Sequence, residues 1–328
     1  MATIKDVARL AGVSPATVSA VVNNSAFVSP TLRLRVERAI RSLNYHPNAL
    51  ARGLKTRRTH TLALLVSDIR NPFYTALVRG VEDVASAHGY TVILGNTDRR
   101  PLKIQNYLTT LIGRRVEGLI LTHVIPQSRV AALRDQGVQV VFLDVRPPAP
   151  YADAVVVNNA EAAYEAVRHL IEHGRRRIGI LGFRSGLSTG RERLEGYHRA
   201  VREARLHPLV VIAPLGAAQA EEAALRLLRQ RPDAVFAANN TLALAVLRAA
   251  RVLGVRIPED CALIGFDDVD WMAVSDPPLS TVAQPIYELG STAARLLLER
   301  LGGHGPKNPS VQVLRGQPVI RRSCGCHG

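Results

Sequence analysis

Polar side chains follow one short apolar run after another from residue 61 onward. If those runs are parallel strands, the side chains share the carboxyl edge of a sheet, where open α/β sheets bind ligands. Asp, Asn and Thr supply hydrogen-bond donors and acceptors, so the chemistry they suit is recognition of a small polar molecule. Each one alone is more simply explained as a helix cap or turn residue, but their recurrence weakens that explanation. They are Asp68, Asn71, Asn96, Asp98, Thr122, Asp144, Asn239, Asn240, Asp267 and Asp268.

Catalytic signatures are missing from the sequence. It contains no P-loop, no Gly-x-Ser-x-Gly elbow and no His-Glu-x-x-His motif. The tail Cys324-Gly325-Cys326-His327 has metal-binding atoms but lacks the paired ligand spacing of a zinc site. We therefore expect a protein that is not an enzyme, with no catalytic residues, no metal and no cofactor.

The apolar spacing also predicts the elements that position the polar side chains. Short apolar runs alternate with helical patterns, as in parallel strands joined by crossover helices. Two series of runs indicate two similar sheets, and hence two lobes with a ligand cleft between them. Strands are expected at 61–67, 90–95, 118–121, 139–143 and 154–157, then at 177–182, 209–213, 234–237 and 262–265. Helices are expected at 73–88, 102–112, 161–173, 191–204, 220–231, 242–253 and 286–300.

The composition favours a folded, cytoplasmic protein. A length of 328 residues suggests two or three domains, and 47% hydrophobic with only 5% aromatic residues indicates an aliphatic core. The N-terminus lacks an export signal, and no run approaches the roughly 18 apolar residues of a membrane span. Three cysteines are too few for a disulfide framework, which agrees with a reducing compartment.

Positive charge is concentrated at the N-terminus. Residues 1–60 hold ten Lys and Arg against two acids, a net +8 out of +15 for the chain. A local basic excess points to a polyanionic partner. The alternative is a generally basic protein, since the remaining residues are also net positive.

Three short helices are predicted within this basic segment. Thr3-Ile4-Lys5-Asp6 has the form of a capping box, and Gly12 suits the end of the first helix. Ser14-Pro15 begins a second helix that runs to about Asn23, and Ser29-Pro30 begins a third by the same device. Helix, glycine turn and short polar-faced helix form the helix-turn-helix layout, although other helical hairpins look similar.

The first 60 residues closely resemble the headpiece of the lactose-repressor/galactose-repressor (LacI/GalR) family. The matching runs are TIKDVARLAGVSPATVSAVVN (Thr3 to Asn23) and VSPTLRLRVERAIRSLNYHPNALARGLK (Val28 to Lys55). The resemblance implies a sequence-specific regulator, expected to be a repressor, with an all-α helix-turn-helix headpiece at 1–46. It also implies a hinge helix and linker at 47–60, where the hinge forms when two subunits meet on operator DNA.

The resemblance implies DNA-binding roles residue by residue. Leu54 matches a leucine that wedges into the minor groove and kinks the DNA, with Lys55 beside it. Base-reading positions fall on Pro15, Ala16 and Ala20, and Thr3 also joins the DNA-binding set. Positions at or near phosphates fall on Ser14, Thr17, Ser19, Asn23, Tyr45 and Asn48.

Ala20 departs from the family pattern, in which Arg or another polar residue is common. Alanine can pack against a thymine methyl but cannot hydrogen-bond to a base. We therefore expect few direct contacts to the bases, so that more of the DNA-sequence specificity comes from Leu54 and from DNA shape.

Residues 61 to 322 resemble the periplasmic-binding-protein-like (type I) sensor of the same family, an α/β fold with two parallel-sheet lobes. The resemblance implies an effector-binding and dimerisation domain at 61–328. The landmarks are Asn71-Pro72-Phe73-Tyr74, Arg115 to Ile120, His173-Gly174, Arg177-Ile178-Gly179, Gly265-Phe266-Asp267-Asp268, Pro278 to Val282 and Gln284-Pro285. The implied effector ligands are Asp144, Arg193, Asn239, Asp267 and Gln284, and the implied pocket walls are Phe73, Tyr74, Thr122, Thr189 and Trp271.

This residue set favours a sugar-like effector. The donor fork of Arg193 and the acceptors of Asp144 and Asp267 can engage neighbouring hydroxyls. The alternative is an internal salt bridge that closes the lobes. Purine-responsive relatives carry a further arginine six residues before the position of Arg193, where this chain has Leu187.

The expected partners are operator DNA, a small effector and a second copy of the chain, with no membrane. Tetrameric relatives carry a C-terminal leucine heptad, whereas this chain ends soon after Val319-Ile320-Arg321-Arg322, so we expect a homodimer. A sugar-binding transport protein would need an export signal and no headpiece. A sugar-modifying enzyme would need a catalytic acid–base pair or a nucleophile.

Overall fold

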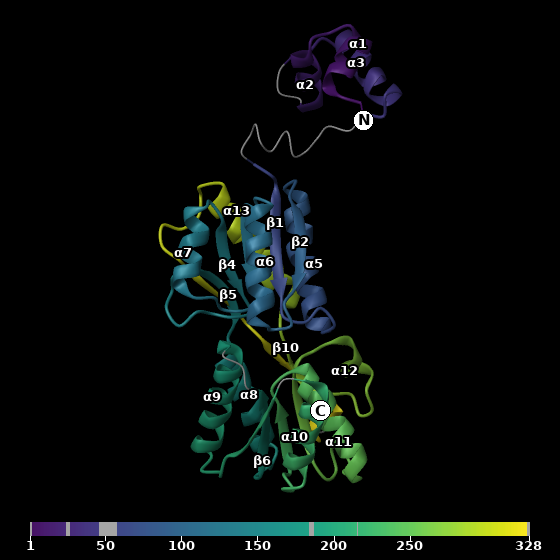
Figure 1. Cartoon of the computed structure of the whole chain (residues 1–328). Helices are drawn as coiled ribbons and strands as arrows, with labels where there is room; N and C mark the ends of the chain where they lie inside the picture. The colour runs from purple at the N-terminus through teal and green to yellow at the C-terminus, as the bar shows by residue number, and fades with distance from the viewer. Residues whose placement is uncertain (1, 24–26, 46–57, 184–186, 215, 327–328) are drawn as a thin grey trace. The chain divides into compact units, whose positions relative to one another are not determined.

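The computed structural model describes residues 2–23, 27–45, 58–183, 187–214 and 216–326. The chain forms two compact units that divide between Thr59 and His60 (Figure 1). Each unit has its own hydrophobic core, so each is described by itself.

The first unit contains the helices α1 (Ile4–Ala11), α2 (Pro15–Asn23) and α3 (Pro30–Ser42). The expected capping box is present, because the Asp6 N–H donates to Thr3 Oγ1 at 3.4 Å and the Thr3 N–H donates to Asp6 Oδ2 at 3.0 Å. Gly12 ends α1 with a left-handed φ of 61°. The small core consists of Val7, Ala8, Ala11, Val18, Val21, Val36 and Ala39.

The second and third helices begin differently. Ser14 Oγ accepts the Thr17 N–H at 3.1 Å and so caps α2 as expected. The Ser29 side chain makes no capping hydrogen bond, so the expectation of the same device at α3 was wrong. Pro30 alone starts that helix, because its ring presets φ and it has no N–H that needs a partner.

The first lobe of the second unit is a six-stranded parallel sheet in the order β11-β5-β4-β3-β1-β2. Leu62 and Leu64 of β1 pack with α5 (Pro72–Ala87) and α13 (Ile286–Leu301) on one face. Ala63 and Leu65 pack with α6 (Pro101–Gly113) and α7 (Gln127–Asp135) on the other, as the period of two in a strand requires. The strands are β1 (Thr61–Val66), β2 (Thr91–Asn96), β3 (Gly118–Leu121), β4 (Gln139–Leu143), β5 (Asp153–Val157) and β11 (Val311–Leu314).

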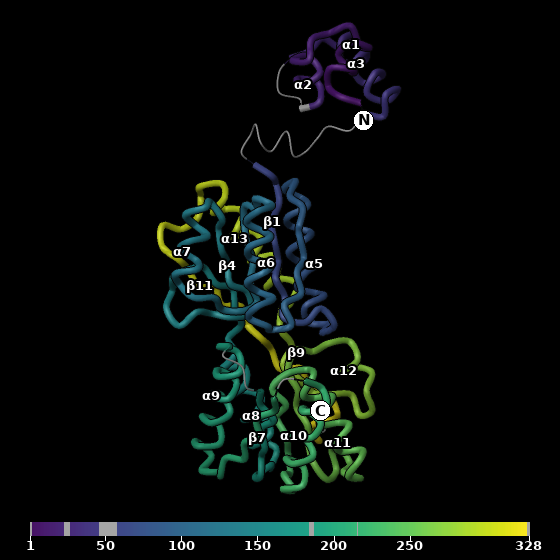
Figure 2. Tube along the Cα trace, viewed as in Figure 1, coloured from purple at the N-terminus to yellow at the C-terminus, as the bar shows by residue number. Residues whose placement is uncertain are grey.

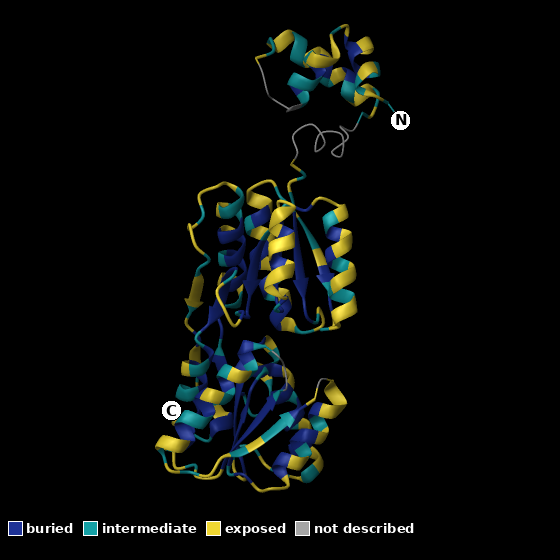
Figure 3. Ribbon diagram, turned by 60° about the vertical axis from the view of Figure 1, so that its left-hand side comes forward, coloured by how far each residue is buried: buried dark blue, intermediate teal, exposed yellow. Residues whose placement is uncertain are grey.

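The second lobe repeats this plan in the order β12-β10-β9-β8-β6-β7, with β12 alone antiparallel. Helices cover both faces, so the inner strands of the sheet appear dark blue in Figure 3. None of the described helices is long and apolar enough to span a bilayer. The strands are β6 (Ile178–Phe183), β7 (Leu209–Ala213), β8 (Ala234–Ala237), β9 (Ala262–Asp267), β10 (Ser280–Ala283) and β12 (Gln317–Val319). The helices are α8 (Asn159–Glu172), α9 (Ser188–Glu203), α10 (Ala217–Leu228), α11 (Asn240–Leu253), α12 (Asp270–Val274) and the 3₁₀ turn η1 (Arg322–Cys324).

The chain passes between the lobes more than once. It enters the second lobe at α8, returns to the first for α13 and β11, and ends on the second with β12 and η1 (Figure 2). The predicted strands and helices of this unit are confirmed to within three residues at each end. The sequence interpretation missed the short elements α7, α12, β10, β11 and β12. β11 and β12 are largely exposed edge strands, which have no continuous apolar run to reveal them.

Candidate functional site

The helix α2 of the first unit has one packed face and one open face. Val18 and Val21 are buried in the core, whereas Pro15 and Ala16 are exposed. Ser14 is also exposed, and Thr17, Ser19 and Ala20 are intermediate. The open face thus carries most of the predicted DNA-reading positions, and short side chains there allow close approach to a groove.

The other predicted DNA-binding residues lie at the start of α1, after the end of α3 or outside the described part. Thr3 is exposed beside α1, and Tyr45 is half-buried against the core. Exposed arginines of α3 include Arg35, Arg38 and Arg41. The predicted roles of Asn48, Leu54, Lys55 and the Asn23 side chain fall outside the described residues.

A cleft of about 470 Å³ opens between the two lobes of the second unit. It lies at the carboxyl ends of the strands, where parallel sheets bind ligands. Of the polar strand-end residues predicted from sequence, Asp68, Asn71, Asp98, Asn239 and Asn240 line it. The apolar part of its lining includes Tyr74, Phe183 and Trp271.

The two lobes meet at an amide pair beside this cleft. Asn71 Nδ2 donates to Asn240 Oδ1 at 3.2 Å, and Asn240 Nδ2 donates to Asn71 Oδ1 at 2.7 Å. A second link joins Arg146 to α9, where its Nε lies 3.1 Å from Glu192 Oε1 and its N–H donates to Ser188 Oγ at 3.0 Å. The neutral amide pair and the partly exposed ion pair each contribute only a small net free energy.

Arg193 is the centre of a buried charged network that meets the cleft at Asn240, whose backbone N–H donates to Asp267. Arg193, Asp144, Asp267 and Gln284 themselves do not line the cleft. Its Nε donates to Asn159 Oδ1 at 2.9 Å, and its Nη1 donates to the Ala238 carbonyl at 2.7 Å. The same Nη1 lies 3.6 Å from Asp267 Oδ1, and the guanidinium stacks 3.7 Å from the Phe266 ring centroid. A guanidinium held on several sides is a preorganised donor.

Asp267 is held as firmly as Arg193. Its Oδ2 accepts the Asn240 N–H at 3.0 Å, and its Oδ1 accepts Gln284 Nε2 at 2.6 Å. Its backbone adopts a left-handed φ of 99°, which is strained for a side chain other than glycine. Such strain persists where surrounding contacts fix the residue, and it is common at ligand sites.

Asp144 is the least satisfied member of the network. Burial raises the pKa of this carboxyl to about 7, Arg193 acts to lower it and Asp267 acts to raise it. Within the described residues, neither Asp144 Oδ1 nor Gln284 Oε1 has a hydrogen-bond partner, although both are buried. A buried acceptor without a partner can accept a hydrogen bond from a hydroxyl donor.

The remaining predicted effector residues occupy different positions. Tyr74 and Asn239 line the cleft, and Asn239 also caps α11 by accepting the Leu242 N–H at 2.8 Å. Phe73, Thr122 and Thr189 are buried and do not line the cleft.

Sequence reasoning missed two polar residues at this site, Arg99 and Asn159, and one buried histidine that follows β3, His123. Arg99 lines the cleft and acts to lower the pKa of Asp144. Asn159 binds Arg193 from the start of α8, and His123 is buried just after Thr122 with both ring nitrogens unpartnered among the described residues. Arg99 lies three residues after the end of β2, and His123 lies two residues after the end of β3. A search for polar residues at strand ends would have found both if it had included basic side chains.

Two family models match the sequence. Residues 3–48 match the bacterial regulatory proteins of the lacI family, and residues 167–324 match a periplasmic-binding-protein-like domain. The HTH-type transcriptional repressor PurR of Photobacterium profundum is 38% identical over 332 residues, covering 98% of each chain. The ribose operon repressor of Escherichia coli (strain K12) is 39% identical over 329 residues, again 98% of each.

Solved structures agree with the predicted fold. The lac repressor dimer bound to operator and the anti-inducer ONPF superposes with a TM-score of 0.89 at 27% identity, over 98% of this chain and 99% of that one. The CelR–cellobiose complex gives 0.75 at 34% identity, over 98% and 100%. The expected combination of helix-turn-helix headpiece and two-lobed sensor is confirmed, and the relatives are repressors rather than enzymes. The chain belongs to the lacI family of bacterial regulatory proteins.

Proposed function

We propose that this chain is a transcriptional repressor whose affinity for operator DNA changes when a sugar binds between its two lobes. The observation that carries the proposal is the pair of buried acceptors, Asp144 Oδ1 and Gln284 Oε1, that have no partner within the described part of the chain. Asp144 is influenced by the charge of Arg193, and Gln284 bonds to Asp267, the ion-pair partner of Arg193. Leaving buried acceptors unpaired costs free energy, so a ligand that supplies hydroxyl donors would be bound favourably.

The donor and acceptor pattern suits a polyol. Arg193 and Arg99 can donate to sugar oxygens, Asp144 and Gln284 can accept from hydroxyls, and Trp271 offers an apolar wall for a ring face. Similar proteins include a ribose operon repressor, a CelR–cellobiose complex and an Enterococcus faecium regulator with bound ribose. They support a sugar of one or two rings.

A purine is the competing ligand, because relatives named PurR are equally similar in sequence. Leu187 is evidence for a sugar rather than a purine. Its side chain is partly buried against the first-lobe core, at a position where the purine-responsive pattern has arginine. A leucine there offers no hydrogen bond to a nucleobase.

On the DNA side, residues 1–46 would form the headpiece, 47–60 the hinge and 61–328 the effector-binding and dimerisation domain. A homodimer would place one headpiece on each half of a pseudo-palindromic operator, by analogy with the lac repressor dimer bound to its operator. Ser14, Pro15, Ala16, Thr17, Ser19 and Ala20 supply the surface that enters the major groove. An operator target and three free cysteines are consistent with action in the cytoplasm.

The proposal is tested by ligand screening followed by two variants. Ribose, cellobiose, hypoxanthine and guanine are compared by thermal shift, and the best ligand is then used in operator-binding assays. Arg193→Ala and Asp267→Ala should bind operator without ligand but lose the response to it, because each removes a buried contact that senses the ligand. A purine as the best ligand would overturn the sugar assignment.

The matched control is Asp268→Ala. Asp268 also forms an ion pair in the second lobe, with Arg321 at 2.6 Å, but it lies outside the network of Arg193. This variant should lose stability and keep its ligand response. A normal response in both Arg193→Ala and Asp267→Ala would show that they only hold the lobe together.

A further inference from the structure

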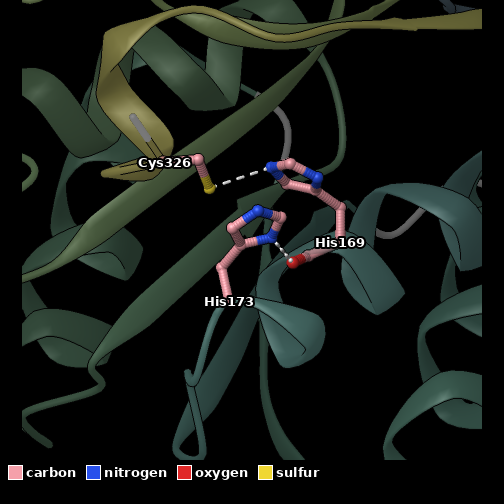
Figure 4. Close-up of side chains that lie close together, drawn as sticks. All are labelled: His169, His173 and Cys326. Carbon is pink, nitrogen blue, oxygen red and sulfur yellow. Dashed lines mark hydrogen bonds between the residues drawn. The ribbon is translucent and has the colours of Figure 1, made fainter. Parts of the chain in front are cut away.

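Three side chains of types that can bind a metal lie close together at the end of α8 (Figure 4). His169 and His173 lie one helical turn apart, and Cys326 reaches them from the C-terminal tail. Their ligand atoms all lie within 4.8 Å of one another, and Cys326 Sγ is 3.1 Å from His169 Nε2. The C-terminal cysteine motif by itself lacks the paired ligand spacing of a zinc site. In the folded chain, His169 and His173 lie beside Cys326.

The histidines are oriented for ligation. His173 Nδ1 contacts the His169 carbonyl at 2.8 Å, and an N–H donated there leaves Nε2 with its lone pair free. A backbone carbonyl that fixes the tautomer of a ring is the usual outer partner of a metal-binding histidine. The two rings lie close together, with centroids 4.2 Å apart and planes tilted by 39°.

The tail that carries the cysteine is fixed in place. Ser323 Oγ donates to the Leu263 carbonyl at 2.6 Å and accepts the Ser280 N–H at 2.7 Å, which ties the tail to β9 and to the start of β10. Arg321 adds a two-pronged pair with Asp268. Cys326 is therefore held near α8 without help from a metal.

The thiol of Cys326 must lose its proton to bind a metal. A coordinated metal ion is a strong enough local charge to deprotonate a thiol outright. Metal binding should therefore release this proton.

We propose that His169, His173 and Cys326 bind a borderline-soft divalent transition-metal ion such as Zn²⁺. Tetrahedral zinc with N and S ligands at about 2.0 and 2.3 Å requires donor atoms roughly 3.3–3.6 Å apart, which small side-chain rotations achieve here. The donor set discriminates against Mg²⁺ and Ca²⁺, which require oxygen. His173 is exposed, so water can enter and complete the coordination.

The bound ion would tie the C-terminal tail to α8. Asn159 at the other end of this helix binds Arg193, so the same helix contacts both the ion and the network of Arg193. The metal would thus stabilise the lobe that carries Arg193 and Asp267.

The test is a titration of the tag-free, metal-stripped full chain with Co²⁺ under a non-coordinating reductant. We expect saturation at one Co²⁺ per chain with a thiolate-to-cobalt charge-transfer band, displacement by Zn²⁺ and a higher melting temperature with Zn²⁺. Cys326→Ser should abolish the charge-transfer band, and His173→Ala should weaken binding about 10-fold or more.

His88→Ala is the matched control. His88 also follows a helix end and also contacts a carbonyl four residues back, that of Val84 at 2.8 Å, but it is not part of the cluster. It should bind Co²⁺ like the unaltered chain, as should Cys261→Ser. Absence of the band, its persistence in Cys326→Ser, or equal losses in His88→Ala and His173→Ala would overturn the proposal and leave only a thiol–imidazole hydrogen bond.

Discussion

Asp144 is the residue at which the proposed effector site departs most from ordinary protein interiors. It is buried, one of its oxygens is unpartnered among the described residues, and Arg193 only partly offsets the cost of burying its charge. Its pKa of about 7 means that the ligand-free site takes up a proton near neutral pH. A structural carboxylate such as Asp153, bound by Arg300 at 2.7 Å and by the Ser310 N–H at 2.8 Å, shows the contrast.

Asp144→Asn should therefore stabilise the ligand-free protein at high pH. In the unfolded chain this carboxyl ionises near pH 4, whereas in the folded chain it stays protonated until about pH 7. The free energy of unfolding that this carboxyl contributes below pH 4 is therefore lost as the pH rises to about 7. Asparagine does not ionise, so the variant avoids that loss. The gain over the unaltered chain should grow by on the order of 1–3 kcal/mol between pH 5 and pH 8.

The measurement is urea unfolding at both pH values. Asp153→Asn is the control and should be destabilised at pH 8, because it breaks a satisfied buried pair. A gain for Asp144→Asn that is the same at pH 5 and pH 8 would contradict the raised pKa.

At the scale of elements, the first lobe depends on an unusually close approach of α5 and α13. A Cβ at Gly80 would lie 2.2 Å from the Tyr287 carbonyl oxygen, and a Cβ at Gly290 would lie 2.2 Å from that of Leu77. Both obstacles are backbone atoms, which cannot rotate away. The two glycines allow α13, a C-terminal helix, to pack on the first lobe. This packing fixes the position at which the chain returns from the second lobe to the first.

Gly80→Ala and Gly290→Ala should each destabilise the protein by about 1–3 kcal/mol or more, because the helices must separate. Gly113→Ala at the end of α6 is the control. No described atom lies within 4 Å of a Cβ there, so it should be neutral or stabilising by up to about 1 kcal/mol. Thermal unfolding measures all three, and equal behaviour would refute the close-packing argument.

The sequence predicted elements better than it predicted contacts. Strands such as β3 and β4 were predictable because each is a complete apolar run between turn residues, and α1 because its cap is local. The edge strand β12 contains Pro318 and is exposed, so it has no such signal. The bond of Asn159 to Arg193 and the meeting of His169 with Cys326 join residues 34 and 157 positions apart, and only the folded chain brings them together.

For the whole molecule, we expect two headpieces to act together on one operator. We expect a homodimer, because the lac repressor structure that matches nearly the whole chain is a dimer on its operator. Sedimentation at micromolar concentration should give a mass near 71 kDa, about twice the 35.6 kDa of one chain. A monomer or a tetramer would contradict this assembly.

We infer that the ligand between the lobes and the operator bind to one coupled system. Such coupling is reciprocal. If the sugar changes the affinity of the protein for operator by a given factor, operator must change the affinity of the protein for the sugar by the same factor. The most direct measurement is the dissociation constant of the sugar for the free protein and for the protein saturated with operator, by isothermal titration calorimetry. We expect two values that differ about 5- to 150-fold, with a ratio matching the change in operator affinity. Equal values would show that the cleft and the DNA-binding surface are not coupled.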